Sequence, residues 1–213
     1  MINKIKEKVS NFITSAPDEE QQIVIVDPRT IQGSSEPDMR TIGLFTDVVE
    51  EKVAELSHAL LYLSELNKLE DSQKAQRPIE FYISTYGGAA DDMFALYDIM
   101  RHVQLATEIH TIGMGKVMSA GVLLLAAGTK GQRKIGKYCR VMIHSAIAGS
   151  HGSLPNLMNE MEALQGLQES YIDALVSETK MTKSQIKKML ERKVNVYLSA
   201  EEAVKFGIAD III

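Results

Sequence analysis

The sequence is poor in cysteine. It contains one cysteine, Cys139, among 213 residues, so no disulfide bond can form within the chain. This usage fits a reducing cytosol, and we expect a cytoplasmic protein. Cys139 lies in an apolar, strand-like run, so we expect its side chain to be buried. Residues 1–15 contain no continuous apolar stretch, and we therefore expect no signal peptide.

A basic excess and a long apolar run are also missing. The 23 Lys and Arg residues against 28 Asp and Glu residues give a net charge of −5. This balance provides no general attraction to nucleic acid or to anionic membranes. The longest apolar stretch, residues 117–127, is too short for a bilayer span of about 20 residues. We expect it to form a buried helix. No group of His, Cys or acidic residues has metal-ligand spacing, so we expect no metal site.

The pattern that is present predicts an α/β domain. With 45% hydrophobic residues, the chain can bury one sizeable core. Residues 1–40 are expected to form a partly mobile N-terminal arm, the alternative being an arm that packs on the domain. From residue 41 to 213, strand-like runs alternate with helical stretches, which predicts a mostly parallel sheet with helical crossovers. A long helix is expected from about residue 154 to 178.

Two short helices near the C-terminus are indicated by capping boxes. In this motif a Ser or Thr side chain and a Glu or Gln side chain satisfy each other's backbone N–H groups. Thr182 with Gln185 predicts one such helix, and Ser199 with Glu202 predicts the other.

A basic run precedes the last strands. Residues 131–137 have the spacing of a phosphate-binding loop, but Tyr138 stands where Ser or Thr would bind magnesium. The run also leads into a strand rather than a helix. We therefore expect a basic hairpin or loop without ATP, lying at a solvated edge or against another subunit. Its charged residues are Lys130, Arg133, Lys134, Lys137 and Arg140.

Ser119 and His144 form a candidate nucleophile and base. Ser119 is expected to begin a helix directly after a strand, and His144 ends an apolar strand 25 residues later. A histidine that accepts the serine proton makes the hydroxyl an effective nucleophile. The N–H of Ala120 and those of the Gly87-Gly88 turn suit an oxyanion. Each feature alone also fits a plainer role, such as a close helix contact, a buried histidine or an ordinary turn.

Taken together, the segments from about residue 41 to 213 resemble the ClpP family, the proteolytic subunits of the caseinolytic ATP-dependent protease. Several ordered motifs at consistent spacing carry this resemblance. They are residues 82–88, 97–100, 115–121, 127–133, 140–144 and 198–210.

The resemblance implies a ClpP/crotonase-like fold of stacked β-β-α units with a long, protruding handle helix. It implies Ser119 as nucleophile, His144 as general base, and the backbone N–H groups of Gly88 and Ala120 as the oxyanion hole. It further implies a homo-oligomer of two stacked heptameric rings, a tetradecamer. An AAA+ unfoldase would consume the ATP and feed in unfolded polypeptides, so that this chain would need no cofactor.

Three positions depart from the family pattern. Tyr86 replaces the proline usual before the glycine pair, and Ser145-Ala146 replaces the usual Gln-Pro after the histidine. Asn195 occupies the position of the third triad residue, an aspartate. Asparagine can accept the histidine N–H through its carbonyl oxygen but supplies no negative charge, and the same change in a serine protease lowers the rate by about 10⁴.

Several alternatives follow from Asn195. The chain is a slow peptidase, or a nearby carboxylate such as Glu191 or Asp173 substitutes for the aspartate. A third alternative is a weakly active or regulatory ring subunit that works with a competent ring of a second ClpP-type subunit. A crotonase-like acyl-CoA enzyme also builds an oxyanion hole from two backbone N–H groups, but the pair of Ser119 and His144 argues against it.

Overall fold

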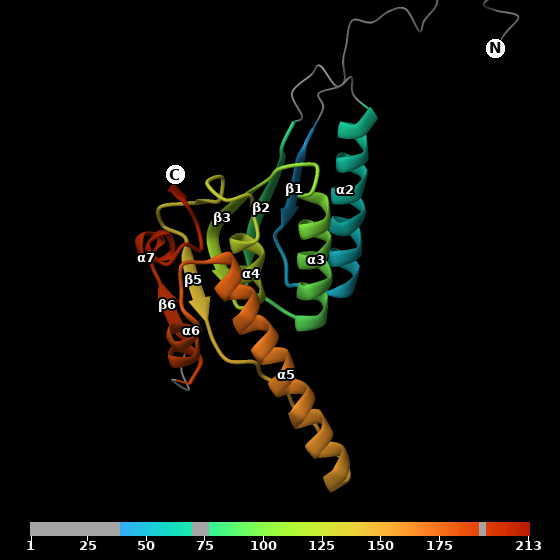
Figure 1. Ribbon diagram of the computed structural model, residues 1–213, viewed down its shortest axis with the longest axis vertical. Helices are drawn as coiled ribbons and strands as arrows, with labels where there is room; N and C mark the ends of the chain where they lie inside the picture. The colour runs from blue at the N-terminus through green and yellow to red at the C-terminus, as the bar shows by residue number, and fades with distance from the viewer. Residues whose placement is uncertain (1–38, 70–76, 192–194) are drawn as a thin grey trace, which may run out of the picture. The chain divides into compact units, whose positions relative to one another are not determined.

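The computed structural model describes residues 39–69, 77–191 and 195–213. The described part is an α/β domain with a seven-stranded sheet (Figure 1). The predicted N-terminal arm, residues 1–40, lies outside the described residues except for its last two. The α/β architecture and the mostly parallel sheet predicted from the sequence are confirmed.

The main path of the sheet is parallel throughout, in the order β1-β2-β3-β4-β7. The strands of this path are β1 (Thr41–Leu44), β2 (Ile79–Thr85), β3 (Ile109–Met118), β4 (Lys134–Ile135) and β7 (Ile211–Ile212).

Strand β3 has different neighbours in its middle and at its C-terminal end. Its middle pairs with β4, whereas its last residues pair with β5 (Arg140–Ile143). Between these regions Gly115 has φ +64°, a conformation that favours glycine. Strand β5 in turn pairs antiparallel with β6 (Val196–Leu198), which the sequence did not predict. The fork in β3 brings its C-terminal end beside β5.

This fork corrects the helix predicted over residues 117–127. Val117 and Met118 belong to β3, and the helix α4 (Ala120–Ala126) begins only after Ser119. A buried strand and a buried helix are both continuously apolar, so the sequence pattern alone does not divide them.

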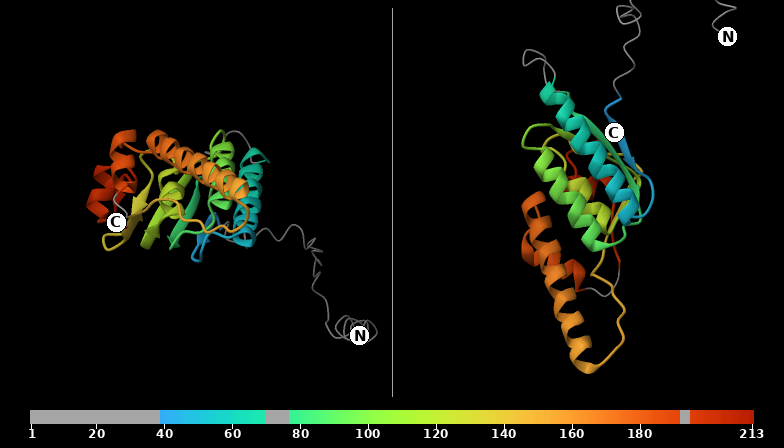
Figure 2. Two further views of the ribbon diagram at one scale, coloured as in Figure 1. Left: turned by 90° about the horizontal axis from the view of Figure 1, so that it is seen from below. Right: turned by 90° about the vertical axis from the view of Figure 1, so that its right-hand side faces the viewer.

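Helices cover one face of the sheet. The remaining helices are α2 (Glu50–Leu69), α3 (Ala90–Val103), α5 (Leu154–Glu178), α6 (Lys183–Leu190) and α7 (Ala200–Lys205). Figure 2 shows α2, α3 and α5 on the same side of the strands. Strand β2 alternates accordingly: Ile79, Phe81 and Ile83 are buried, and the residues between them are half-buried. The second face of the sheet is therefore partly open in the single chain.

Helix α5 has two dissimilar parts. Its C-terminal part is packed on the domain through Tyr171, Ile172 and Leu175, which are buried. Its N-terminal part extends past the other elements (Figure 1) and exposes Leu154 and Met158 to solvent. The bounds predicted for this long helix, and its protrusion, are confirmed.

Both predicted capping boxes are present. The Thr182 hydroxyl accepts from Gln185 N–H at the start of α6, and the Ser199 hydroxyl accepts from Glu202 N–H at the start of α7. Cys139 is buried as expected, and burial raises the pKa of its thiol from 9.0 to about 11, which keeps it protonated at neutral pH.

The prediction that the basic run lies at a solvated edge is wrong for Arg133, because this residue is only 3% exposed. Its guanidinium donates to Asp210 at 2.6 and 2.8 Å and to the Glu178 carbonyl at 2.7 Å. Lys130 donates to the Glu178 carboxylate at 2.7 Å. Through these contacts the charged side chains of the loop link the end of α5 to the segment before β7.

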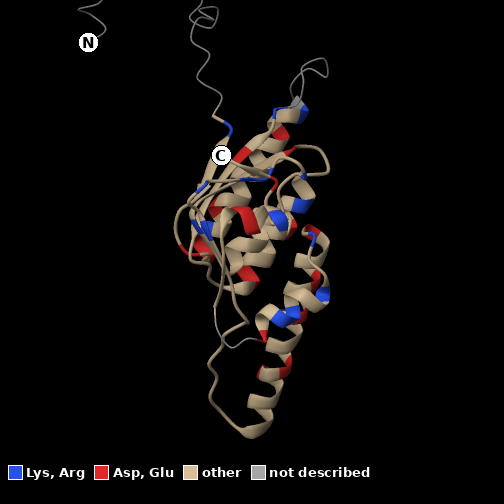
Figure 3. Cartoon of the chain, turned by 90° about the vertical axis from the view of Figure 1, so that its left-hand side faces the viewer, with Lys and Arg blue, Asp and Glu red and all other residues tan. Residues whose placement is uncertain are grey.

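Charged residues of both signs are interspersed on the side of the domain drawn in Figure 3. Of the helices in the described ranges, none combines the length and the apolar character that a bilayer span requires.

Candidate active site

Ser119 occupies a strained turn between β3 and α4. Its φ of 53° and ψ of −121° make it the non-glycine residue with positive φ in the described chain. Such a conformation costs about 1–3 kcal/mol and persists only where the surroundings enforce it. The Ser119 N–H donates to Met142 O at 2.8 Å, and the Tyr171 hydroxyl donates to Ser119 O at 3.1 Å. Sharp strand-to-helix turns of this kind present the nucleophilic serine in α/β-hydrolases.

The glycine pair after β2 lies directly against this turn. A Cβ atom on Gly87 would lie 2.6 Å from the Cβ of Ser119, and one on Gly88 would lie 2.1 Å from Val48 O. Val48 N–H donates to Gly87 O at 2.7 Å, and Ala89 N–H donates to Val48 O at 2.9 Å. Neither bond uses the N–H of Gly88. Glycine is thus required at both positions by close approach of the backbone.

His144 follows directly after β5 and is half-buried. Its Nδ1 lies 2.6 Å from Ser145 O. Because a carbonyl oxygen only accepts, Nδ1 carries the hydrogen, and Nε2 is left with the lone pair. This is the tautomer that a general base requires when it accepts a serine proton through Nε2.

Asn195 directly precedes β6, and His144 directly follows β5. The last pair of the antiparallel β5–β6 ladder is Ile143 with Val196, so His144 and Asn195 both lie just beyond this pair. The Asn195 side chain is exposed, however, and His144 Nδ1 donates instead to the neighbouring Ser145 carbonyl.

The two carboxylates considered as substitutes for an aspartate lie elsewhere. Asp173 accepts from Lys183 at 2.6 Å and is exposed, and Glu191 is the exposed C-cap residue of α6. Neither residue lines the cavity that contains His144.

Ser119, His144, Gly88 and Ala120 line one cavity of about 460 Å³. Four of the five predicted site residues therefore converge, although they come from β2–α3, β3–α4 and the end of β5. Asn195 does not line this cavity. Leu164 and Leu167 of α5 supply part of its apolar wall.

Three further residues of this cavity were not found by sequence reasoning. Tyr171 is buried, and burial raises the pKa of its hydroxyl, which keeps it neutral and able to donate to Ser119 O. Gln168 Oε1 accepts from Ala146 N–H at 3.1 Å and ties the loop after His144 to α5. The third is Asp91, at the start of α3. None of them stands in a local motif that could have marked it in the sequence.

Among the described residues, no group of three or more His, Cys, Asp or Glu side chains is arranged to hold a metal ion.

The α/β domain holds a strained serine, a histidine and the backbone N–H groups of two turns around one cavity. This combination is typical of the serine-hydrolase class. The family model for Clp proteases matches residues 35–213, so the chain belongs to the Clp protease family. It is 30% identical over 174 residues to the ATP-dependent Clp protease proteolytic subunit 1 of Prochlorococcus marinus. The aligned region covers 82% of this chain and 84% of that protein. It is 34% identical over 143 residues to the ATP-dependent Clp protease proteolytic subunit of Deinococcus radiodurans, which covers 67% and 68% respectively.

Proposed function

We propose that this chain is the serine peptidase subunit of a cytoplasmic, self-compartmentalised ATP-dependent protease. The observation that carries the proposal is the strained Ser119 at the head of α4, in one cavity with a His144 whose Nε2 is free to accept a proton. The membership in the Clp protease family supports the same function.

In the proposed reaction the Ser119 hydroxyl attacks the carbonyl carbon of a peptide bond while His144 Nε2 takes its proton. The N–H groups of Gly88 and Ala120 stabilise the negative charge on the carbonyl oxygen. His144 then gives the proton to the leaving amine, which departs as the C–N bond breaks. Water, deprotonated by His144, hydrolyses the acyl-serine ester and restores the hydroxyl. This chemistry needs no cofactor in the chain itself.

The third group determines the rate. The Ser145 carbonyl accepts from His144 Nδ1, and Asn195 precedes Val196, the ladder partner of Ile143, but neither Ser145 nor Asn195 carries a negative charge to stabilise the imidazolium. Exchanging the triad aspartate for asparagine costs about 10⁴ in rate, or about 5–6 kcal/mol of activation free energy. We therefore propose a slow peptidase. A weakly active ring subunit that needs a competent partner ring is the alternative, favoured by the same Asn195.

The proposed assembly is a homo-oligomer of two stacked heptameric rings. Two surfaces support association: the exposed apolar part of α5 and the partly open second face of the sheet. An AAA+ unfoldase would supply unfolded polypeptide and consume the ATP, which agrees with the name of the relatives, ATP-dependent proteolytic subunits.

A fluorophosphonate probe tests the nucleophile, because it phosphonylates activated serine hydroxyls. We expect intact-mass labelling of the assembled protein at one serine, absent in Ser119→Ala and strongly slowed in His144→Ala. Ser153→Ala is the matched control, since this exposed serine makes no capping bond at the start of α5. Absence of labelling in the wild-type assembly would overturn the peptidase and leave the structural ring subunit.

A further inference from the structure

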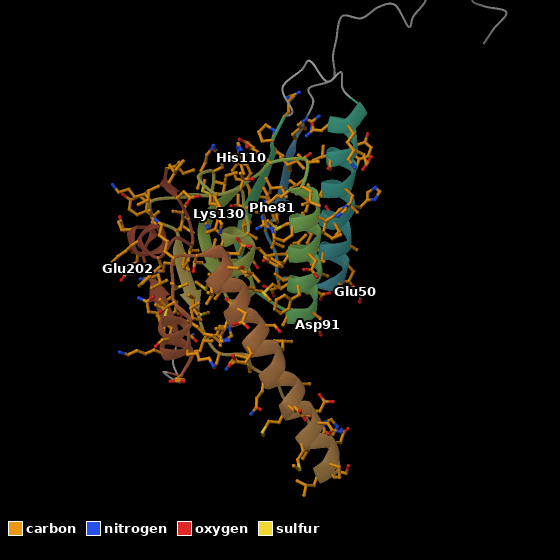
Figure 4. All side chains as sticks on the ribbon, viewed as in Figure 1. Glu50, Phe81, Asp91, His110, Lys130 and Glu202 are labelled. Atoms are coloured by element: carbon orange, nitrogen blue, oxygen red, sulfur yellow. The ribbon has the colours of Figure 1, made fainter. Side chains whose placement is uncertain are left out.

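Asp91 gives the cavity a single full charge. Among the described residues that line the cavity, it is the one side chain that is charged at neutral pH when His144 is neutral. It lies in the first turn of α3, at the end of the helix labelled in Figure 4. The lining of the cavity that contains Ser119 therefore carries one negative charge.

The Asp91 carboxylate is not neutralised by a partner. It is exposed, and within the described ranges no Lys, Arg or His side chain forms an ion pair with it. A carboxylate at this position also interacts favourably with the N-terminal end of a helix, which accounts for its presence but not for its placement in the cavity. Asp92, the next residue, provides the same negative charge in the same turn without lining the cavity.

The other walls are apolar. Met93, Leu164 and Leu167 line the cavity together with Ile147 from the loop after β5. Lys and Arg side chains combine an apolar stem with a cationic end, so an apolar wall that ends in a carboxylate suits them. In trypsin, a carboxylate in the specificity pocket selects such residues in the same way.

We propose that this cavity is a specificity pocket for basic side chains, with Asp91 pairing the Lys or Arg side chain next to the peptide bond that Ser119 cleaves. The inference rests on the proposed peptidase function and names its substrate class. A chain that is otherwise acidic and lacks a basic excess would thus favour positively charged segments of its substrates.

The test compares the cleavage of two short fluorogenic peptides that differ only in Arg or Leu before the scissile bond. We expect the assembled wild-type protein to favour the Arg peptide in kcat/KM. Asp91→Asn should lower this Arg-to-Leu ratio by about tenfold, the lower end of the range for a hydrogen bond to a charged group, because the Asp91 side chain is exposed. Asp92→Asn, which removes one charge from the same turn, should keep the ratio. High salt should reduce the preference of the wild type.

A second readout separates this inference from the proposed function. Diphenyl phosphonates with an arginine-like or a leucine-like side chain label an activated serine covalently, and their rates are followed by intact mass. Labelling by both probes at equal rates, or a ratio that Asp91→Asn and Asp92→Asn change equally, overturns the basic specificity alone. No labelling by either probe and no cleavage of either peptide overturns the proposed function itself.

Discussion

At the scale of single residues, Ser119 places conformational strain at the proposed nucleophile. Its φ of 53° lies in a region that glycine adopts freely and alanine does not. We therefore predict that Ser119→Gly unfolds with a free energy about 1 kcal/mol higher than Ser119→Ala, although both lack the hydroxyl. Denaturant titration of the two variants measures the difference.

The control pair is Ser84→Gly and Ser84→Ala in β2. Ser84 has an extended backbone within a strand, where glycine is the less stable residue. The order of stability should therefore reverse at this position. If the glycine variant is less stable than the alanine variant at both positions, residue 119 is not strained.

Asn195 gives the second prediction at this scale. Asn195→Asp introduces a carboxylate just beyond the Ile143–Val196 pair, at the same end of the ladder as His144, and should raise kcat/KM for a short peptide at least tenfold, because the charge stabilises the imidazolium in the transition state. Asn195→Ala tests the amide itself and should not exceed wild type. If the aspartate variant cleaves no faster, the Ser145 carbonyl alone orients His144, and Asn195 is not the third member of the triad.

At the scale of elements, the end of α5 is fixed by a buried carboxylate. Glu178 is 3% exposed and accepts from Tyr97 at 2.9 Å, Arg101 at 2.8 Å and Lys130 at 2.7 Å. Burial opposes the charged form, but the hydrogen bonds from Lys130 and Tyr97 and the charge of Arg101 together lower the pKa of Glu178. The cluster joins α3, the loop before β4 and the end of α5. Lys130 is labelled in Figure 4.

Glu178→Gln should lower the free energy of unfolding by about 2 kcal/mol at pH 7, because buried donors lose their anionic partner while Lys130 and Arg101 keep partial access to water. In the wild type this contribution is present above the ordinary pKa of 4.5 and is lost as the pH falls through the lowered pKa of the folded state. Glu178→Gln should thus have the shallower loss of stability below pH 4.5. Asp98→Asn, an exposed site on α3, serves as the control and should change neither quantity.

Elements with a local signal were predictable from the sequence. The capping boxes at Thr182 and Ser199 set the starts of α6 and α7, since side-chain capping is decided within four residues. The start of α4 was predicted three residues too early, at 117 instead of Ala120, because β3 and α4 are both buried and lack distinguishing periodicity. Strand β6 was missed because a strand of three residues is specified by its partner β5, which is remote in the sequence.

The structure places side by side several of the residues that the sequence named as candidates for the site. Ser119, His144 and the glycine turn stand at strand ends, where a parallel sheet gathers functional residues, and the structure brings them into one cavity. Asp91 and Gln168 enter the cavity only through the packing of α3 and α5. No pattern in either helix marks them, so their contribution required the three-dimensional structure.

At the scale of the whole molecule, the protruding part of α5 predicts the assembly. Leu154, Met158 and Met161 are 71%, 63% and 63% exposed and recur at helical spacing along one stripe. An apolar stripe on an isolated helix is unstable in water unless another surface covers it. Covering by α5 helices of a second ring would satisfy it.

We predict that Met158→Glu separates the two stacked rings, so that sedimentation velocity shows a species of half the mass. The introduced charge would be buried at the contact without a partner. Asn159→Glu adds the same charge at the next exposed, polar position and should leave the larger species intact. If both variants sediment like the wild type, α5 does not form the contact between rings.

The strain at Ser119 also distinguishes the two roles proposed for the chain. A subunit that only built the ring would gain stability from glycine at position 119 and would lose nothing by the exchange. Position 119 is nevertheless a serine, in a backbone conformation that penalises it, beside a glycine at 87 that leaves room for its Cβ. The hydroxyl group that this serine carries is what the proposed peptidase requires and what a purely structural subunit does not.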